Sequence, residues 1–206
     1  LLIEHVIFTG KSEPPYKAFL FQGHILDEKG NKMSKSQGNM VEGIETLNSN
    51  PVDIMRFYIV WKASPIDNLN FSFNEMNTRP YQVLSTLYHL HLYLLQNSSC
   101  DRFEINQHSL QWASDQSLLR SQEKWLLSKL QQIKKSCTEG NETCRFQSSA
   151  RAIEKFLIED LSQTYVPMTR KEIWDDSPET LNRRLAIYAT LAHVLKVLDI
   201  LLHPIS

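Results

Sequence analysis

The sequence predicts a mostly α-helical protein in which an antiparallel helical bundle follows a short, turn-rich β region. Two observations predict this fold class. Residues 73–202 carry four long segments with apolar side chains at helical spacing, joined by short polar connectors. The first forty residues instead combine β-like runs with glycine and proline. At 206 residues, of which 42% are hydrophobic, the chain is long enough to bury a core.

The β region is expected to contain three short strands. Residues 4–9 and 18–21 are rich in apolar and β-branched side chains and are predicted as strands. Ile25 and Leu26 are predicted as the third, which ends in a turn at residues 27–31 because Asp, Gly and Asn are typical turn residues. This arrangement predicts the edge of a sheet that leads through a hairpin into a loop.

After the loop the chain is expected to become helical. Asn50 is a suitable N-cap, and Pro51 suits the first position of a helix because its missing N–H has no partner there. Val52, Met55 and Ile59 follow at helical spacing. We therefore predict a helix that starts at Pro51.

A polar segment at residues 64–70 predicts a domain boundary. It divides the chain into residues 1–70 and residues 71–206. The second part is the predicted bundle, with Ser114 and Asp115 capping its second helix, a polar loop after that helix and a helix break at Val166 and Pro167. The four helices are predicted at residues 73–96, 114–136, 146–164 and 178–202, and the polar loop at residues 137–142.

Charge and composition limit the classes of partner. The chain has 22 basic and 23 acidic residues, a formal net charge of -1, so it has no overall attraction to DNA or to an anionic membrane. No apolar run is expected to reach the roughly 20 residues that span a bilayer. The three cysteines have no zinc-site spacing and are expected to be reduced thiols, and no metal site is predicted. We expect a cytoplasmic protein whose polyanionic partners, if any, meet a local basic patch.

The stretch from Gly30 to Asn39, GNKMSKSQGN, is the strongest candidate for such a patch. Lys32 and Lys35 are three residues apart in a glycine-flanked loop, so both ammonium groups can reach one polyanion. Two such groups would stabilise the negative charge that develops on a leaving pyrophosphate. Two lysines alone would favour a solvated hairpin tip, in which lysine, serine and glycine are the expected residues.

The complete string decides between these two interpretations. Lys32-Met33-Ser34-Lys35-Ser36, between a strand with a glycine turn and the sequence QGNMV, resembles the KMSKS loop of class I aminoacyl-tRNA synthetases. The resemblance implies that Lys32 and Lys35 are catalytic and bind the phosphates of ATP, which is used with Mg²⁺. It also implies that Met33 lies near the adenine, and that Ser34 and Ser36 help to shape the ATP-binding loop.

Further segments resemble the isoleucyl, valyl and leucyl subgroup of this class. These are DIMRFY at residues 53–58, EKWLLSKL at residues 123–130, and DLSQTYV at residues 160–166 with Arg170 and Trp174. The last of them is most similar to isoleucyl enzymes. Two more segments resemble the isoleucyl branch of archaeal or eukaryotic type, namely NLNFSF at residues 68–73 and TGK at residues 9–11 before PPYK at residues 14–17. Valyl and leucyl specificity stay open as alternatives, as does a non-catalytic helical module that binds RNA or another protein.

The resemblance implies what each part of the chain does. Residues 1–70 would be the end of a Rossmann-type catalytic domain with the KMSKS loop and connecting helices. Residues 71–206 would be an α-helical domain that binds the anticodon stem and loop of a tRNA, with ATP and isoleucine as the other partners. The chain contains no His-Ile-Gly-His motif, so we expect it to have no ligase activity by itself.

The predicted RNA contacts lie after the expected break at Val166 and Pro167. Arg170, Lys171 and Trp174 combine positive charge with an aromatic ring, which suits contact with phosphate and stacking of an anticodon base. A capped loop with a buried tryptophan is the alternative. Trp125 is expected in the core. Five more basic residues are expected to face either RNA or solvent: Lys129, Lys134, Lys135, Arg183 and Arg184.

Overall fold

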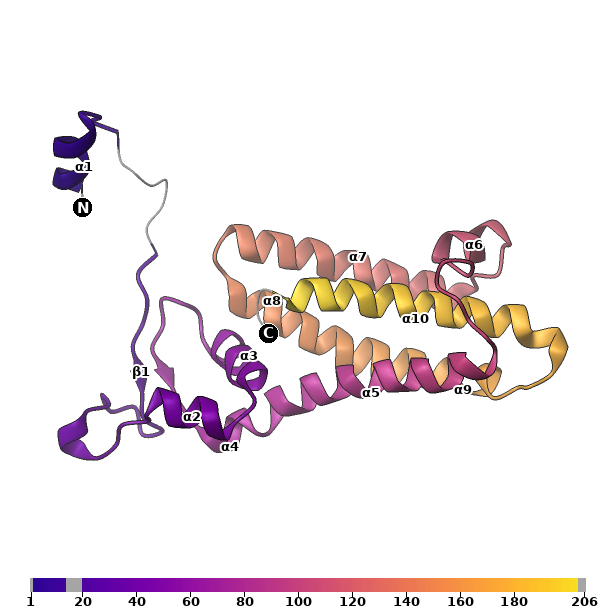
Figure 1. Ribbon diagram of the computed structural model, residues 1–206, viewed down its shortest axis with the longest axis horizontal. Coiled ribbons are helices and arrows are strands. Elements are labelled where there is room, and N and C mark those ends of the chain that lie inside the picture. The colour runs from indigo at the N-terminus through magenta and orange to yellow at the C-terminus, as the bar shows by residue number, and fades with distance from the viewer. Residues whose placement is uncertain (1, 14–19, 204–206) are drawn as a thin grey trace.

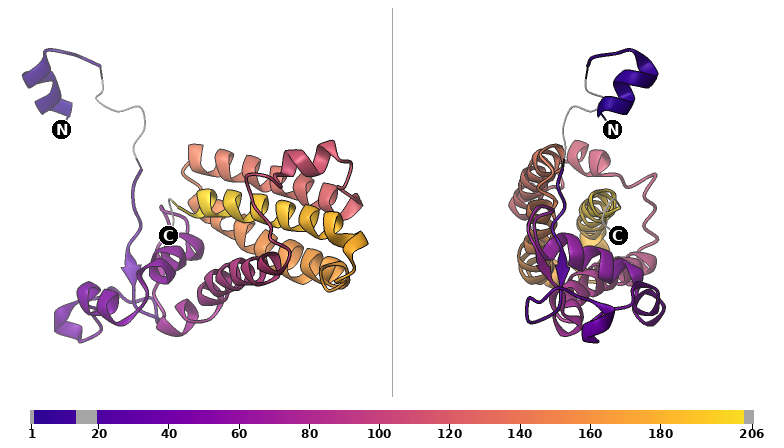
Figure 2. Two further views of the ribbon diagram at one scale, coloured as in Figure 1. Left: turned by 45° about the vertical axis from the view of Figure 1, so that its right-hand side comes forward. Right: turned by 90° about the vertical axis from the view of Figure 1, so that its left-hand side faces the viewer.

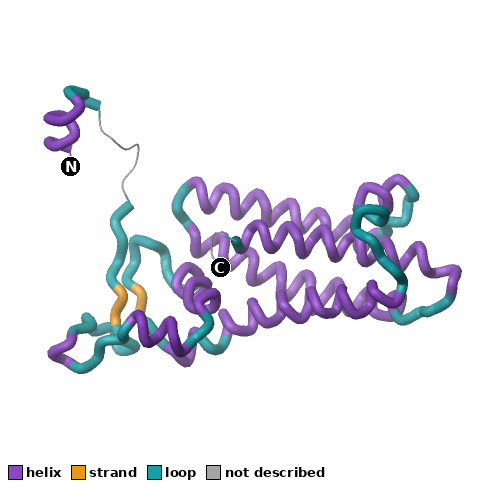
Figure 3. The backbone as a smooth tube through the Cα atoms, viewed as in Figure 1, coloured by secondary structure: helices purple, strands orange, loops and turns teal. Residues whose placement is uncertain are grey.

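The structure is a computed structural model, and it describes residues 2–13 and 20–203. The described part is mostly helical, as predicted, with one small sheet (Figures 1 and 3). Four long helical stretches lie side by side and form the bundle (Figure 1). They are α5 (Arg79–Cys100), α7 (Ser121–Glu142), α8 (Phe146–Lys155) with the helical turns that continue it, and α10 (Leu181–Leu202).

Helix α10 is the centre of the bundle. The end-on view in the right panel of Figure 2 shows it surrounded by the other helices. Residues 183–192 are all buried, so the helix has no solvent-facing side over that length. The predicted fourth helix is confirmed, with residues 178–180 forming a 3₁₀ turn before it.

The same stretch tests the expectation about membrane-length segments, and that expectation was wrong. Pro178–Leu202 is 25 residues long and apolar enough to cross a membrane by length and composition. In the structure 67% of its most apolar window is buried by the other helices. A helix that is covered on all sides by protein needs an apolar surface all round, so its composition follows from its central position.

Arg183 and Arg184 were expected to face RNA or solvent, and this was wrong because both are buried near the start of α10. The Arg183 guanidinium donates to Glu123 Oε2 at 2.8 Å and Oε1 at 2.9 Å, and to Glu172 Oε2 at 2.7 Å. Glu123 is fully buried, and it also accepts from the Tyr165 hydroxyl at 3.1 Å. Burial raises the pKa of Tyr165 well above its usual value, and the Glu123 carboxylate raises it further.

Arg184 is satisfied by different partners. Its guanidinium forms a two-pronged pair with Asp101, with both N–O distances at 2.7 Å. Tyr188 donates to the same carboxylate at 2.9 Å. The hydrogen bonds from Arg184 hold the pKa of Asp101 below its usual value. The two arginines therefore tie α10 to α7, to residue 172 and to the end of α5.

The predicted helix break at Val166 and Pro167 does not exist. Helix α8 continues as a π-helix (Phe156–Tyr165) and then as α9 (Val166–Ile173), so residues 146–173 form one helical run. The backbone N–H of Val166 donates to the carbonyl of Leu161, five residues earlier, as expected for π turns. Pro167 lies in the first turn of α9, and the wider turn before it accommodates a residue without an N–H.

Two boundaries of the second predicted helix were also wrong. Ser114 and Asp115 lie in a separate short helix, α6 (Leu110–Asp115), instead of capping α7. Residues 137–142, predicted as a polar loop, are the last turns of α7. Gly140 lies where these turns meet α8, and a Cβ at that position would lie 2.4 Å from Ser149 Oγ, so glycine suits the close approach of the two helices. The Ser149 hydroxyl donates to the Cys137 carbonyl at 3.3 Å across the same contact.

The N-terminal part differs from its prediction in one element. Residues 4–9 were predicted as a strand but belong to helix α1 (Leu2–Thr9), which lies apart from the bundle (Figure 1). The described residues offer this segment no neighbouring strand, so its backbone groups bond within the segment instead. Of the predicted strand at residues 18–21, residues 18 and 19 lie outside the described residues, and the prediction was wrong for Leu20 and Phe21, which are not in a strand.

The third predicted strand is confirmed as β1 (Ile25–Leu26). It pairs in parallel with β2 (Leu69–Asn70), which was not predicted, with Ile25 opposite Leu69 (Figure 3). A strand of two residues carries too little periodicity to be found in a polar segment. The strand β2 and the buried side chains of Ile54, Tyr58, Phe71 and Met76 form a second small core. The domain boundary near residue 70 stays a prediction.

Short helices connect the sheet to the bundle. They are α2 (Gly43–Ser49), α3 (Val52–Lys62) and α4 (Phe73–Met76). Asn50 ends α2, and Pro51 is the residue before the first helical position of α3, so the predicted start is wrong by one residue. The predicted helix at residues 73–96 is interrupted at Asn77 and Thr78, where α4 ends before α5 begins.

Helix α3 is joined to the bundle by polar contacts with α8. Arg151 donates to the carbonyls of Trp61 at 3.2 Å and of Lys62 at 3.0 Å, the last carbonyls of α3. The Glu154 carboxylate accepts from the indole N–H of Trp61 and from Arg79. These contacts fix the position of the sheet region against one end of the bundle.

We predict that Glu123→Ala strongly destabilises the chain, because it removes the buried carboxylate that accepts from the Tyr165 hydroxyl and from two nitrogens of Arg183, and leaves Glu172 as the one acid that pairs with that guanidinium among the described residues. The free energy of unfolding should fall by about 3–5 kcal/mol, measured by urea unfolding followed by circular dichroism. The matched control is Glu139→Ala on the same helix. Glu139 is exposed and lies 3.8 Å from Lys135, so its loss should change the free energy by less than about 1 kcal/mol. Equal losses in the two variants would contradict the role of the buried pair.

Candidate functional site

The lysine loop is a compact turn that leaves β1 and leads to α2. Lys32 forms an antiparallel bridge with Leu26, which closes the predicted hairpin at residues 27–31. Residues Lys35–Gln37 form one 3₁₀ turn, and it ends at Gly38, whose φ of 65° is in the left-handed region that favours glycine. Residues 32–39 are all exposed or half-buried, so apolar packing does not hold this loop.

Two polar side chains hold the loop instead. Asp27 Oδ1 accepts from the backbone N–H groups of Asn31 at 2.7 Å and Lys29 at 3.0 Å. Asp27 Oδ2 accepts from the Asn39 side-chain amide at 2.9 Å. The Asn39 amide also donates to the Lys32 carbonyl at 3.3 Å, and its oxygen accepts from the Ser34 N–H at 3.0 Å. These hydrogen bonds, with that from Asn39 the largest, hold the pKa of Asp27 below its usual value.

The two lysines project from this turn without acidic partners. Both are exposed, and among the described residues no carboxylate lies within 4 Å of either ammonium group. Met33 and Ser34 are half-buried, and the hydroxyls of Ser34 and Ser36 lie 3.2 Å apart. The structure thus brings all five predicted residues together in one turn and leaves two positive charges free to meet an anion.

Sequence reasoning missed Asp27 and Asn39. The turn composition around Asp27 was visible, since an Asp side chain commonly accepts backbone N–H groups in a turn. The contact between Asp27 and Asn39 was not visible because it joins side chains twelve residues apart. It depends on the exact course of the loop between them.

The predicted RNA contacts lie at the other end of the long axis of the molecule, at the end of α9 (Figure 1). The Arg170 guanidinium lies over the Trp174 ring, 5.6 Å from its centre. Trp174 is 65% exposed, which contradicts the alternative of a buried tryptophan. Lys171 is also exposed. The ring is therefore available for stacking, with a cation already on one side of it.

Trp174 also borders a hollow of about 220 Å³. Its other lining residues come from the ends of α5 and α9, the loop after each of them, and α10. They are Asn97, Cys100, Asp101, Ile173, Asp176 and Tyr188. Asp101 is held there by Arg184 and accepts from the Tyr188 hydroxyl, so the pairs inside the bundle also shape this surface.

The other basic residues vary in availability. Lys129 lies 3.6 Å from Asp160 and close to the Trp125 ring. Trp125 is half-buried and packs against the core, as predicted. Lys135 pairs with Glu139 on α7, and Lys134 is exposed. Of the five basic residues expected to face RNA or solvent, the three lysines are at the surface and the two arginines are buried.

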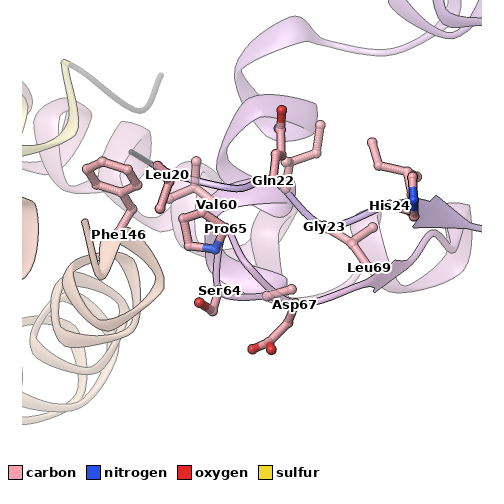
Figure 4. Close-up of a pocket in the computed structure, with 13 residues that line it drawn as sticks. Leu20, Gln22, Gly23, His24, Val60, Ser64, Pro65, Asp67, Leu69 and Phe146 are labelled. Atoms are coloured by element: carbon pink, nitrogen blue, oxygen red, sulfur yellow. The ribbon is translucent and has the colours of Figure 1, made fainter. Parts of the chain in front are cut away.

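A larger hollow of about 340 Å³ lies between residues 20–25, the end of α3 and the start of α8 (Figure 4). Leu20, Val60, Pro65 and Phe146 supply much of its apolar wall. Of the described residues that line it, only His24 and Asp67 are ionisable, and none of the predicted site residues is among them. The lysine loop is therefore a surface site that is separate from this hollow.

Metal-binding groups are not gathered in the described part of the chain. Within residues 2–13 and 20–203, no cluster of three or more His, Cys, Asp or Glu side chains could hold a metal ion. Cys100, Cys137 and Cys144 are free thiols, and burial raises the pKa of Cys137 to about 11.

Two family matches cover most of the chain. Residues 2–72 match the family described as tRNA synthetases class I (I, L, M and V), and residues 123–206 match the anticodon-binding domain of tRNA ligase. The fold agrees: a Mycobacterium tuberculosis methionyl-tRNA synthetase structure superposes with a TM-score of 0.71 at 17% identity, over 88% of this chain and 34% of that one. A leucyl-tRNA synthetase from Agrobacterium radiobacter gives 0.58 over 88% and 22%. The chain therefore belongs to the class I tRNA synthetases.

The branch within this class follows from the sequence relatives. The isoleucine–tRNA ligase of Methanothermobacter thermautotrophicus is 35% identical over 196 residues, which are 94% of this chain and 18% of that protein. That of Pyrococcus furiosus is 34% identical over 93% of this chain and 17% of the relative. The chain is similar to a segment of these isoleucine–tRNA ligases, and it spans about 18% of their length. The KMSKS resemblance predicted the class, and the resemblance of residues 160–166, with Arg170 and Trp174, predicted this branch.

Proposed function

We propose that the full-length protein containing this chain joins isoleucine to its tRNA at the expense of ATP, and that this chain supplies the phosphate loop and the RNA-binding bundle. One observation carries the proposal: in a segment of the synthetase family, Lys32 and Lys35 extend without acidic partners from a turn held by side-chain hydrogen bonds. A solvated hairpin tip would not need such anchoring. We further propose the division into residues 1–70 and 71–206, and a cytoplasmic location.

The reaction gives the two lysines a defined task. An isoleucine carboxylate oxygen attacks the α-phosphorus of ATP, a P–O bond forms, and the bond to the pyrophosphate oxygen breaks. Negative charge accumulates on the leaving pyrophosphate in the transition state. Lys32 and Lys35 stabilise that charge, and their effect is larger in the transition state than in bound ATP because the charge grows as the bond breaks. The aminoacyl group then moves to the 3′ end of the tRNA.

The remaining loop residues act on ATP binding. Met33 lies against the adenine, and the Ser34 and Ser36 hydroxyls keep the turn in shape through their mutual contact. Mg²⁺ accompanies ATP and neutralises part of the phosphate charge. The described residues of this chain offer no cluster of metal ligands, so we assign the ion no ligand here.

The bundle binds the anticodon arm of the tRNA through the end of α9. Arg170 and Lys171 contact phosphate, and Trp174 stacks a base. Support comes from the exposure of all three side chains, the Arg170 guanidinium beside the ring, and the hollow bordered by Trp174. A flexible single-stranded loop offers bases that can be splayed out onto such a ring.

We predict that the full-length protein catalyses isoleucine-dependent exchange between ATP and pyrophosphate, and that Lys35→Ala lowers the rate by about 100-fold, as is typical for the loss of one transition-state donor. tRNA affinity, measured by filter binding, should change less than about threefold, since the lysine acts on the phosphates of ATP. The 206-residue chain alone should show no exchange. Exchange that depends on valine or leucine would move the assignment to that branch, and no exchange with any amino acid would favour a non-catalytic module.

We predict different salt dependences for two bundle variants of the full-length protein. Arg170→Ala should reduce the slope of log affinity for tRNA against log salt by about 1, because one phosphate contact is lost. Trp174→Ala should weaken binding by about 1–3 kcal/mol at every salt concentration without changing the slope, because stacking is not ionic. Lys155→Ala, which removes an exposed lysine of α8, is the control and should change neither quantity. Identical slopes for the Arg170 and Lys155 variants would contradict the proposed phosphate contact.

A further inference from the structure

The Asn39 side chain occupies an unusual position at the end of the lysine loop. Its amide group makes three hydrogen bonds, to the Lys32 carbonyl, to the Ser34 N–H and to the Asp27 carboxylate. The first two partners directly precede and follow Met33 in the sequence. The Asn39 amide therefore joins the backbone on either side of Met33 through two hydrogen bonds. It is half-buried, whereas Lys32 and Lys35 are exposed.

Asp27 connects this bridge to the sheet. It follows β1 directly, and its N–H donates to the Asn31 carbonyl at 2.9 Å, while its carboxylate accepts two N–H groups of the same turn. Asp27 and Asn39 together form a polar clamp between the start and the end of the loop. Since residues 32–39 have no buried side chain, this clamp supplies the side-chain contacts that set their course.

The clamp acts on the segment that carries the two lysines. Lys32 is held through its own carbonyl, and Lys35 directly follows Ser34, whose N–H is held. The long lysine side chains remain free to rotate, but the points from which they extend are defined relative to β1. Ammonium groups that must meet a pyrophosphate as its charge develops are most effective when their backbone is already in place.

We infer that Asn39 is a positioning residue for adenylate formation, which acts through Lys32 and Lys35 and depends on Asp27. This inference rests on the proposed function, because it assigns Asn39 a role in the reaction of the same loop. Asn39 need not touch ATP. Its effect on the reaction is the orientation of the two cations.

The test is exchange between ATP and pyrophosphate by the full-length protein. Asn39→Ala should lower kcat about tenfold or more, with less than about threefold change in KM for isoleucine, because the lost effect belongs to the transition state. In a Lys35→Ala background the same substitution should cost less than about threefold, because residues that act as one unit are not additive. A full, multiplicative loss in that background would overturn the inference.

A charge exchange tests the contact between the two side chains. Asn39→Asp places two carboxylates face to face and should be worse than Asn39→Ala. In the double variant with Asp27→Asn, the new amide at position 27 donates to the new carboxylate at position 39. The amide oxygen at position 27 still accepts from the turn N–H groups. Activity should therefore recover at least about fivefold over Asn39→Asp alone. Failure to recover would overturn the pairing with Asp27. Asn48→Ala, an exposed asparagine of α2, is the control and should keep full activity.

Hydrogen exchange supplies a second readout in the 206-residue chain itself. The Ser34 amide should exchange at least about fivefold faster in Asn39→Ala than in the unchanged chain, because its acceptor is removed. The Leu69 amide, which donates to the His24 carbonyl at 2.9 Å, should keep its rate. An unchanged Ser34 rate would overturn the inference. Absence of isoleucine-dependent exchange in the unchanged full-length protein would instead refute the proposed function, while this measurement would still report on the clamp.

Discussion

The bundle depends on the pairing of two arginines that α10 carries inside the protein. A guanidinium cannot lose its proton, so burying it requires carboxylates in fixed positions. Glu123 and Glu172 meet that requirement for Arg183, and Asp101 meets it for Arg184. The three acids come from α7, α9 and the end of α5, which means that one helix determines where its neighbours lie. Apolar packing supplies most of the driving force, but it is non-directional and would tolerate other registers.

The same pairs connect the interior to the proposed RNA surface. Glu172 lies two residues before Trp174, and Asp101 and Tyr188 line the hollow that Trp174 borders. A ring that stacks on a base gains affinity when it does not have to be ordered on binding. In the proposed contact with RNA the buried charges act indirectly, because they hold the end of α9 and the end of α5 in a fixed relation.

Predictions that depend on neighbouring residues in the sequence agree with the structure. Predictions that depend on contacts between residues far apart in the sequence differ from it. The helical pattern predicted the bundle, and the string from Lys32 to Ser36 predicted the loop and its five residues. Arg183 and Arg184 were expected to face RNA or solvent because Glu123 and Asp101, which accept from them in the interior, lie 60 and 83 positions away. The same reason hid the contact between Asp27 and Asn39. Pro167 was taken as a break since proline usually ends a helix, but the π turns before it change that local rule.

The unbroken helical run at residues 146–173 fixes the distance between its contacts with α3 and its end beside Trp174. Its first turns are bonded to α3 through Arg151 and Glu154, and its last turn ends beside Trp174. At about 1.5 Å per residue, the α-helical residues of α8 and α9 alone measure about 27 Å, and the π-helix between them adds to that length. Adding or removing a single residue within it would turn one end by about 100° relative to the other. The number of residues in this helical run therefore sets the distance and the rotation between its two ends. Substitutions within the run are tolerated far more easily than insertions or deletions.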